Sequence, residues 1–503
     1  MRRLIVVGLL AFAVALTGTA YAEVQNIKVS GDIDMKGIAH HNYDLKEKNR
    51  NFSHPESAGV GTTVVTNDDD EMFYLSTVNV QVDADLTDNV STSVRLMNQR
   101  KWDNGSGTQD DVHLENAYVT LKEFLYSPLT IIAGRQNLNY GTGFIVGNNG
   151  RLQDPEVVFP ATDSASLQPN GREYSAFNSF DAIRAILDFA PLTVEALVSK
   201  NNETGVLTND EDMYGLIVNY KLDRWNAEIE PYWFYLNDES GARTITVNDA
   251  SVSNAGTIAR VYEINRVHTV GLRAAAAPIE NLKLNGEVAH QFGEMIDSNP
   301  VAVGPNRQKR DRSAWGANVY ANYTWAQVPW TPSTGVGGVF FSGEQAATED
   351  VTLNGVGEGG SGDDKFNAWD SIYRDQHTTF IEDFLGGQDA SANLYTTLDR
   401  NDTSAATNRR YLFLDASAKP IQDVTLWARY TRSWFDIAPR PGRDKHAGDE
   451  VDAKLLYDYT EDVQLSAFGG WFIPGKYYDG ESNSIVRSND MAWTAGAGAK
   501  VKF

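Results

Sequence analysis

The sequence predicts an all-β fold: a transmembrane antiparallel β-barrel of about eighteen strands, with short periplasmic turns and long extracellular loops. Three observations predict it. Hydrophobicity alternates with a period of two along many segments of about ten residues. The connections between these segments alternate between tight turns and long polar loops. Aromatic residues gather near the predicted strand ends, where they favour the membrane interface.

The first 22 residues have the pattern of a secretory signal peptide. Arg2 and Arg3 precede an apolar run from Leu4 to Leu16, and small residues then end in Ala20-Tyr21-Ala22. The run is shorter than the ~20 residues that a spanning helix needs, and it ends in an A-x-A cleavage site. We therefore expect a signal peptide over residues 1–22 and a barrel over residues 23–503, in the bacterial outer membrane.

Composition excludes several classes of protein. The 503 residues carry a formal net charge of −24, so nucleic acid is a poor partner. Cysteine is absent, which excludes disulfides, thiolate metal sites and covalently attached c-type haem. The length alone suggests several soluble domains, but no shift in composition marks a boundary between them. A closed hydrogen-bonded sheet is one source of stability for such a chain.

The last segment, "DMAWTAGAGAKVKF", shows the alternation best. Trp493, Ala495 and Val501 share one face with other apolar residues, and Thr494 and Lys500 share the opposite face. One face suits lipid and the other suits water. The same pattern predicts strands at 25–39, 72–87, 89–101, 112–123, 127–137, 178–190, 192–200, 212–222, 225–237, 261–276, 281–293, 313–325, 334–343, 408–419, 422–434, 449–460, 462–473 and 490–503.

The connections decide between a membrane barrel and a soluble β-sandwich. Tight turns lie at 87–89, 190–191, 223–224, 278–280, 420–421 and 460–462, and long loops lie at 40–71, 138–177, 238–260, 294–312 and 344–407. A sandwich has no reason to keep every second connection short, whereas an outer-membrane barrel does. The longest loop, 344–407, can remain extracellular or fold into the barrel mouth as a constriction or lid.

Projecting the alternation gives charged side chains that point into the lumen. The main candidates to line a pore are Arg95, Arg135, Arg184, Arg273, Arg429, Asp83, Glu195, Glu228, Glu230 and Asp452. The arginines could form a basic ladder opposed by acids on neighbouring strands, which would set up a transverse field. Alternatively, these charges pair in salt bridges and merely satisfy one another.

The stretch "GRQNLNYGTGFIVGNNG" contains closely spaced glycines. It is one residue too long for a G-x-G-x-x-G dinucleotide turn, and a polar, proline-broken loop follows it instead of a helix. We expect Gly141, Gly143 and Gly147 at the extracellular rim, where the chain folds tightly over the mouth and a side chain would block the backbone. Gly134 is expected to leave room beside an inward Arg135.

Metal binding and catalysis find little support. Asp68, Asp69 and Asp70 form an oxygen-rich run that could hold Ca²⁺ or Mg²⁺ bridging to lipopolysaccharide phosphates, or could be a solvated acidic loop. The basic cluster at 307–312 could likewise bind lipopolysaccharide phosphate or remain solvated. No H-E-x-x-H, G-x-S-x-G or phosphate-loop motif is present. We therefore expect neither an enzyme nor a cofactor.

Three segments resemble the alginate-export family of outer-membrane porins. "GRQNLNYGTGFIVG" at 134–147 is similar to that family's G-R-Q-x-x-x-Y-G-x-x-x-x-G, and "SGE" at 342–344 opens a long loop that returns to "GDDKFNAW" at 362–369. Residues 448–475 resemble the family's penultimate hairpin, which ends in Phe-x-Pro-Gly. Outer-membrane proteins also commonly end in an aromatic residue, here Phe503.

The resemblance implies a monomeric barrel of about eighteen strands whose best-known relative passes a polyanionic polysaccharide outward through a basic constriction. The excess of acid here argues against a dedicated alginate exporter. We expect a channel for hydrophilic solutes or ions, anionic or saccharide substrates among them, with outer-membrane lipid and lipopolysaccharide as surroundings. The alternative is a sheath that encloses a partner such as a multihaem cytochrome, although about eighteen strands leave a narrow interior.

Overall fold

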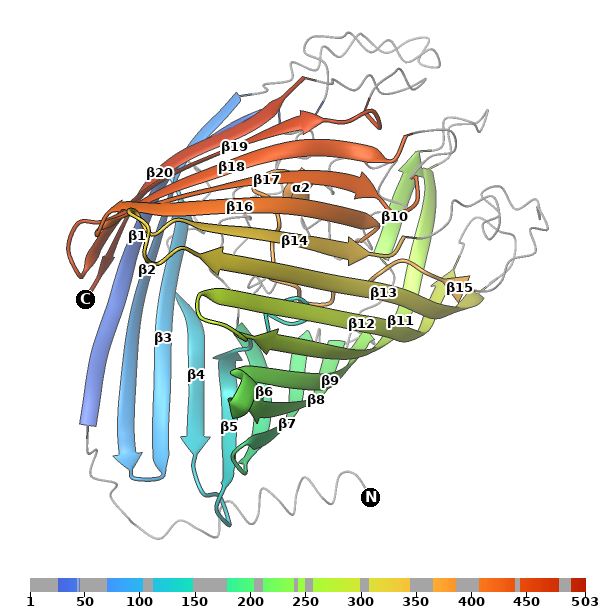
Figure 1. Ribbon diagram of the computed structural model, residues 1–503. Coiled ribbons are helices and arrows are strands. Elements are labelled where there is room, and N and C mark those ends of the chain that lie inside the picture. The colour runs from blue at the N-terminus through green and yellow to red at the C-terminus, as the bar shows by residue number, and fades with distance from the viewer. Residues whose placement is uncertain are drawn as a thin grey trace.

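The strands of the chain form a closed antiparallel wall (Figure 1). The computed structural model describes residues 26–42, 45, 70–102, 112–147, 179–202, 211–238, 243–248, 257–298, 307–343, 365–385, 407–438, 444–478 and 490–503. Of the strands within them, all except β10 and β15 belong to the wall, which leaves an 18-strand barrel. The wall closes because β1 pairs with both β2 and β20.

The wall strands are β1 (Asn26–His41), β2 (Asp70–Thr87), β3 (Val90–Lys101), β4 (His113–Leu121), β5 (Leu129–Asn137), β6 (Ser179–Asp188), β7 (Leu192–Asn202), β8 (Glu211–Leu222), β9 (Ala227–Asp238), β11 (Thr257–Ala276), β12 (Leu282–Ser298), β13 (Arg307–Thr324), β14 (Ser333–Phe341), β16 (Arg409–Ile421), β17 (Val424–Phe435), β18 (His446–Asp458), β19 (Val463–Pro474) and β20 (Ala492–Lys502). Each corresponds to one predicted segment, so the predicted fold class is confirmed. The main boundary difference is that β11, β12 and β13 continue further into the long-loop end than the alternation predicted.

Outward side chains are apolar, as lipid requires. On β16, Leu412 and Leu414 are 56% and 55% exposed, whereas Tyr411 and Phe413, which alternate with them, are buried. Outward residues on the neighbouring strands, such as Val336 and Tyr430, are exposed in the same way. Among the described residues, no helix is long and apolar enough to cross a membrane.

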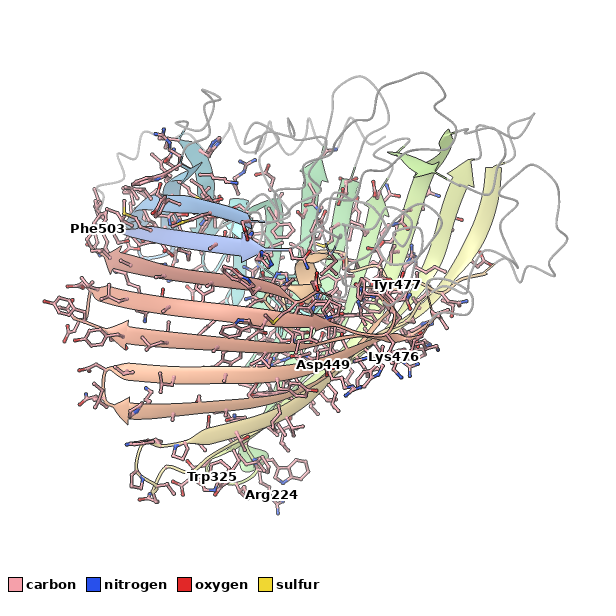
Figure 2. All side chains as sticks on the ribbon, turned by 90° about the horizontal axis from the view of Figure 1, so that it is seen from above. Arg224, Trp325, Asp449, Lys476, Tyr477 and Phe503 are labelled. Carbon is pink, nitrogen blue, oxygen red and sulfur yellow. The ribbon has the colours of Figure 1, made fainter. Side chains whose placement is uncertain are left out.

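The C-terminus lies in the seam that closes the barrel. The Phe503 backbone N–H donates to the Gly31 carbonyl at 3.0 Å, and the Gly31 N–H donates to the Phe503 carbonyl at 2.8 Å. A Cβ on Gly31 would stand 2.6 Å from the Phe503 ring, so only glycine leaves room for that ring. Figure 2 shows Phe503 at one end of the C-terminal strands and Asp449 toward their other end.

Two accessory strands lie outside the wall. β10 (Arg243–Asn248) pairs with the first part of β11, and the two-residue β15 (Lys365–Phe366) pairs in parallel with β13. β15 leads into a segment that includes the short helix α2 (Glu382–Leu385). That segment packs against inward-facing residues of the wall, so it lies inside the barrel.

Candidate functional site: a constriction inside the barrel

Two inserted segments meet in the lumen. We name residues 138–147, which follow β5, the β5 loop, and residues 367–385 the lumen strap. Their backbones pair in parallel: the Tyr373 N–H donates to the Ile145 carbonyl at 3.1 Å and the Gly147 N–H donates to the Tyr373 carbonyl at 2.9 Å. The Asp375 N–H then donates to the Gly143 carbonyl at 2.9 Å. Paired backbones make the two loops one unit.

The glycines of the β5 loop make this pairing possible. Gly141 and Gly143 have φ angles of 58° and 74°, which side chains disfavour. A Cβ on Gly147 would stand 2.5 Å from the Asp375 Cβ. The sequence placed these glycines in a fold over the mouth, whereas the structure places them inside the lumen, beneath the strap. Gly143 and Gly147 lie against Asp375 of the strap, whereas Gly141 lies against Arg273 of β11.

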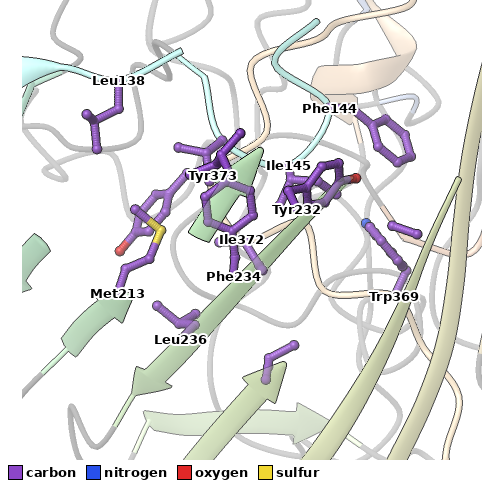
Figure 3. Close-up of a cluster of buried hydrophobic side chains, with 14 of the residues drawn as sticks. Leu138, Phe144, Ile145, Met213, Tyr232, Phe234, Leu236, Trp369, Ile372 and Tyr373 are labelled. Carbon is purple, nitrogen blue, oxygen red and sulfur yellow. The ribbon is translucent and has the colours of Figure 1, made fainter. Parts of the chain in front are cut away.

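Apolar side chains fill the lumen between these loops and the wall (Figure 3). Phe144 of the β5 loop stacks on Phe341 of β14 at 5.4 Å between ring centroids, and Trp369 of the strap lies 5.8 Å from Phe144. The cluster also takes inward residues of β6, β7, β8, β9, β11, β12, β13 and β16. This half of the lumen is therefore a hydrophobic core and not a wet wall.

The alternation of the sequence predicted polar groups on the inner face of the barrel. This apolar core was not predicted. A signal was present: on β8, Met213 and Ile217 face inward while Tyr214 and Leu216 face outward. A strand that is apolar on both faces must be covered on both faces. Such strands are the sequence mark of a wall that an inserted loop covers.

The strap is anchored first to the wall strands β11–β13 and β7–β8. The Asn265 side chain donates to the Asp370 carboxylate at 2.8 Å, and the Arg312 guanidinium lies 3.8 Å from the same group. Further along, the Tyr373 hydroxyl donates to the Glu211 carboxylate, and Asn201 donates to that hydroxyl. Each wall partner faces the lumen.

The strap is anchored next to β16–β18. Glu450 is 1% exposed, and its carboxylate accepts the backbone N–H groups of Phe380, Ile381 and Glu382 at 2.8, 2.7 and 2.9 Å. The Arg429 guanidinium donates to the Thr378 carbonyl at 2.9 Å. Because β16–β18 stand nearly opposite β7–β8 in the order of pairing, the strap crosses the lumen.

Two adjacent carboxyls near the end of the strap have opposite pKa shifts. Burial raises the pKa of Glu382 to about 8, although Arg409 lies 3.4 Å away and favours the charged form. Burial also acts to raise the pKa of Asp383, but Arg374 and His377 outweigh it, so this pKa is lowered. Asp383 also accepts the Tyr411 hydroxyl at 2.8 Å. This end of the strap is fixed by charge as well as by packing.

The middle of the strap remains accessible. Asp375 and Gln376 are partly exposed and His377 is exposed, whereas the residues on either side are buried. Burial raises the pKa of Asp375 to about 6, and the nearby Arg374 opposes that rise. The Arg374 guanidinium is directed elsewhere, at 3.5 Å from Asp383 and over the Phe341 ring. Residues 375–377 therefore form the accessible edge of the constriction.

Four of the five arginines predicted to line the lumen do face it, and each is paired. Arg184 makes a bidentate contact with Glu195 at 2.6 and 2.9 Å. Arg429 makes a similar contact with Asp415 at 2.6 and 3.1 Å. The other contacts are Arg273 to Glu228 at 2.7 Å and to Glu230 at 4.0 Å, and Arg95 to Asp32 at 3.7 Å. This geometry favours the salt-bridge alternative over a free basic ladder.

The predicted acids also lie on the inner face. Glu195, Glu228 and Glu230 are the partners of arginines, as described above. Asp83 accepts both contacts from the Gln81 amide at 3.0 Å. Asp452 is fully buried beside Glu450, below the strap. Asp32, which was not among the main candidates, is a hub between Arg95, Lys500 and the Asn79 amide.

The structure corrects the expectation for Arg135, which lies on the outer face. It pairs with Asp181 at 3.0 Å, and Asp181 alternates on β6 with Phe180 and Ala182, which pack in the lumenal core. Apolar residues occupy both faces of β5, so the alternation could not choose between them. Gly134 does not make room for an inward arginine; its φ of 127° and its close approach to β4 exclude a side chain.

A cavity of about 770 Å³ opens at the end of the barrel that carries the short turns. Lys221, Lys283 and Glu228 line it together with Asp415, Tyr320 and Trp427. Two of these carboxylates are held by Arg273 and Arg429, whereas no ion pair to Lys221 or Lys283 occurs among the described residues. We call this cavity the vestibule.

The metal candidates are only partly described. Asp68 and Asp69 lie outside the described residues. Asp70 begins β2 and contacts the His41 ring at 2.5 Å. Within the described ranges, no group of three or more histidine, aspartate or glutamate side chains is placed to hold a metal ion.

Solved porins are among the structures to which the chain is similar, at low sequence identity. A BenF-like porin from Pseudomonas fluorescens Pf-5 shares 9% identity with a TM-score of 0.49, covering 95% of this chain and 99% of the porin. Pseudomonas aeruginosa OccK2 (OpdF), solved in complex with glucuronate, shares 10% identity with a TM-score of 0.48, covering 95% and 98%. Acinetobacter baumannii OccAB1 shares 9% identity with a TM-score of 0.48, covering 97% and 99%.

Comparison by sequence gives the family. No curated protein matches the chain. The profile of the family described as alginate export matches residues 56–487, which is most of the chain. Together with the closed barrel and its apolar outer face, this match makes the protein an outer-membrane porin-like barrel and not an enzyme. The chain belongs to the alginate export family.

Proposed function

We propose that the protein is a passive outer-membrane channel for small hydrophilic solutes or ions, whose size limit is set by the lumen strap and the β5 loop. The observation that carries this proposal is the strap itself, which crosses the lumen and is anchored on nearly opposite walls. A segment fixed across the lumen narrows it and limits the size of the solutes that pass. In this proposal, solutes pass down their own concentration gradient.

The route we propose runs from the vestibule past the strap and along the wall of β20 and β1–β5. Many inward groups there are polar or charged and carry both signs: Lys36 pairs with Asp34 at 2.7 Å, and Lys500 lies 3.4 Å from Asp32. Ile38, Phe73 and Leu75 form a small buried apolar cluster on the same wall. A wall with paired charges supports weakly selective passage of polar solutes. The paired arginines argue against a dedicated conduit for a polyanionic polysaccharide, although anionic or saccharide solutes of small size remain compatible with the lumen.

The lumen gives no support to the alternative of a sheath around a partner protein. The described part of the strap and the β5 loop occupy the middle of the barrel with buried aromatic rings. A multihaem cytochrome would have to displace this core. We further propose that the barrel works as a monomer surrounded by lipid and lipopolysaccharide, because its outer face is apolar around the wall.

Planar-bilayer recording of the purified protein tests the proposal. We expect steady single-channel currents, and liposomes that carry the protein should swell in small sugars but not in large oligosaccharides. A barrel that carries no current and co-purifies with a haem protein would contradict the channel proposal and support the sheath. Light scattering coupled to size-exclusion chromatography measures the oligomeric state, and a trimer would contradict the proposed monomer.

A further inference from the structure

We propose that Asp375, at the accessible middle of the lumen strap, makes this channel prefer cations to anions. This inference rests on the proposed channel function. It differs from the expectation that wall arginines set the selectivity. The class of solute that it favours is small inorganic cations and organic solutes with a net positive charge.

Asp375 lies on the part of the strap that spans the lumen. The strap joins the β7–β8 wall, through Tyr373, to the β16–β18 wall, through Thr378 and Glu382. Residues 375–377 lie between these anchors. A solute that traverses the barrel must pass one edge of a segment that crosses it, and residues 375–377 are the longest accessible run of the strap.

The wall arginines are paired with carboxylates, and the Asp375 carboxylate is not paired with any described residue. Wall arginines Arg95, Arg184, Arg273 and Arg429 each lie within 4 Å of a carboxylate. The Asp375 carboxylate, in contrast, has no hydrogen bond or ion pair with any described residue. Arg374 next to it is directed to Asp383. Paired charges largely cancel in their effect on a passing ion, whereas an unpaired charge does not. Lys221 and Lys283 also lack an ion pair among the described residues, but they line the vestibule and not the constriction, where Asp375 lies.

The backbone around Asp375 is held in place on both sides. The Asp375 N–H donates to the Gly143 carbonyl, and its Cβ packs against the backbone of Gly147. Tyr373 and Thr378 are tied to the wall on either side. The carboxylate is therefore held at a fixed place in the constriction, where a single charge acts on every ion that passes.

His377 tunes this charge. Its Nδ1 atom lies 3.9 Å from the Asp383 carboxylate, and part of its ring is exposed. When protonated, it adds a positive charge beside the negative charge of Asp375. Among the described residues of the strap, the charged groups at this edge are Arg374, Asp375, His377 and Asp383, and the β5 loop meets Asp375 through the backbone of Gly143 and Gly147.

The test is the reversal potential of single channels in a KCl gradient, for wild type and Asp375→Asn. One unit charge about 5 Å from the path in a water-like medium changes the local ion concentration about fourfold before screening. Because the charge enriches cations and depletes anions by the same factor, we expect Asp375→Asn to lower the ratio of cation to anion permeability by about tenfold at low salt. Conductance itself should change much less, because asparagine has nearly the same size.

Asp181→Asn is the matched control, because it removes the same charge from the outer face and should leave the reversal potential unchanged. An Asp375→Asn channel with wild-type selectivity overturns the inference while its currents uphold the channel. Absence of current in wild type instead overturns the channel itself. If Asp375→Asn fails to assemble, Gln376→Lys adds the opposite charge at the same edge, and unchanged selectivity in that variant also overturns the inference.

Acidification gives an independent measurement. Below a pH of about 6 the Asp375 carboxyl takes up a proton, and the loss of its negative charge reduces cation preference. Wild type should therefore lose cation selectivity between about pH 8 and about pH 5. Asp375→Asn should show a smaller change over that range, and a change as large as that of wild type would count against the role of Asp375.

Discussion

The two halves of the lumen wall differ in what covers them. Along β6–β16, inward residues such as Phe180 and Phe234 are buried beneath the β5 loop and the lumen strap. Along β20 and β1–β5, several inward residues are charged and paired: Asp32 of β1 with Arg95 of β3, and Lys36 with Asp34 on the same strand. One half behaves like the core of a soluble domain and the other like the wall of a channel. An inward position in a barrel is therefore not by itself a wet position.

The difference has a physical cause in the loops. A strand that faces water on one side needs polar residues on that side, whereas a strand covered by a loop needs apolar ones. The strap supplies Trp369, Ile372 and Tyr373 to one wall and leaves Asp375 to His377 accessible. The strap therefore presents apolar side chains to the wall strands that are apolar on their inner face.

The largest expected effect comes from the covered half. Trp369→Ala removes a fully buried ring from between the β5 loop and β14, and such truncations cost about 3–5 kcal/mol. We expect a corresponding loss of resistance to unfolding, measured by the heat-dependent change in electrophoretic mobility. Trp315→Ala is the control, since that ring is 52% exposed on the outer face. Equal losses in both variants would mean that the lumenal core does not stabilise the barrel.

Glu450→Ala is expected to have the next largest effect, because it removes the acceptor of three backbone N–H groups and frees one end of the strap. Leaving buried donors unpaired costs about 1–3 kcal/mol each when no water replaces the acceptor. The barrel should still assemble, with larger and noisier single-channel currents. Asp449→Ala, next to it in β18, should keep wild-type currents, since Asp449 accepts the exposed Tyr430 hydroxyl. Quiet, wild-type currents in Glu450→Ala would contradict the anchoring.

Gly147→Val tests whether the β5 loop positions the lumen strap. A side chain at this position would overlap Asp375, and overpacking of this kind costs about 1–3 kcal/mol. We expect the strap to shift and the liposome-swelling assay to give a changed size limit. Gly286→Val is the control, because the nearest atom to its Cβ is 3.9 Å away on the outer face. An unchanged size limit in Gly147→Val would show that the β5 loop does not position the strap.

The smallest effect is expected outside the lumen. Arg135→Ala removes an exposed ion pair with Asp181, and such pairs contribute about 0–1 kcal/mol. Stability and reversal potential should both stay close to wild type. A clear shift of the reversal potential would place Arg135 next to the ion path and would contradict its position on the outer face.

Sequence reasoning identified the wall well and the constriction poorly. Alternation gave all eighteen wall strands, because lipid on one side imposes a period of two over each segment. It failed for Arg135, because Ile131, Ile132 and Ala133 make both faces of β5 apolar and remove the signal. The glycines of the β5 loop were identified as a tight fold, but nothing local shows which distant segment packs on them.

What the sequence by itself determined is the set of properties that come from the period of two and from local backbone demands: the eighteen strands, the turns, and the need for glycine at Gly141 and Gly143. The tertiary structure alone decided which loop enters the lumen, which arginines meet which carboxylates, and that the Asp375 carboxylate has no hydrogen bond or ion pair with any described residue. These depend on residues far apart in the chain, such as Glu211 with Tyr373 and Phe380 with Glu450. Such contacts produce no periodic pattern in the sequence, because each joins two particular residues. The alternation of the strands, in contrast, arises because lipid selects apolar residues at every second position.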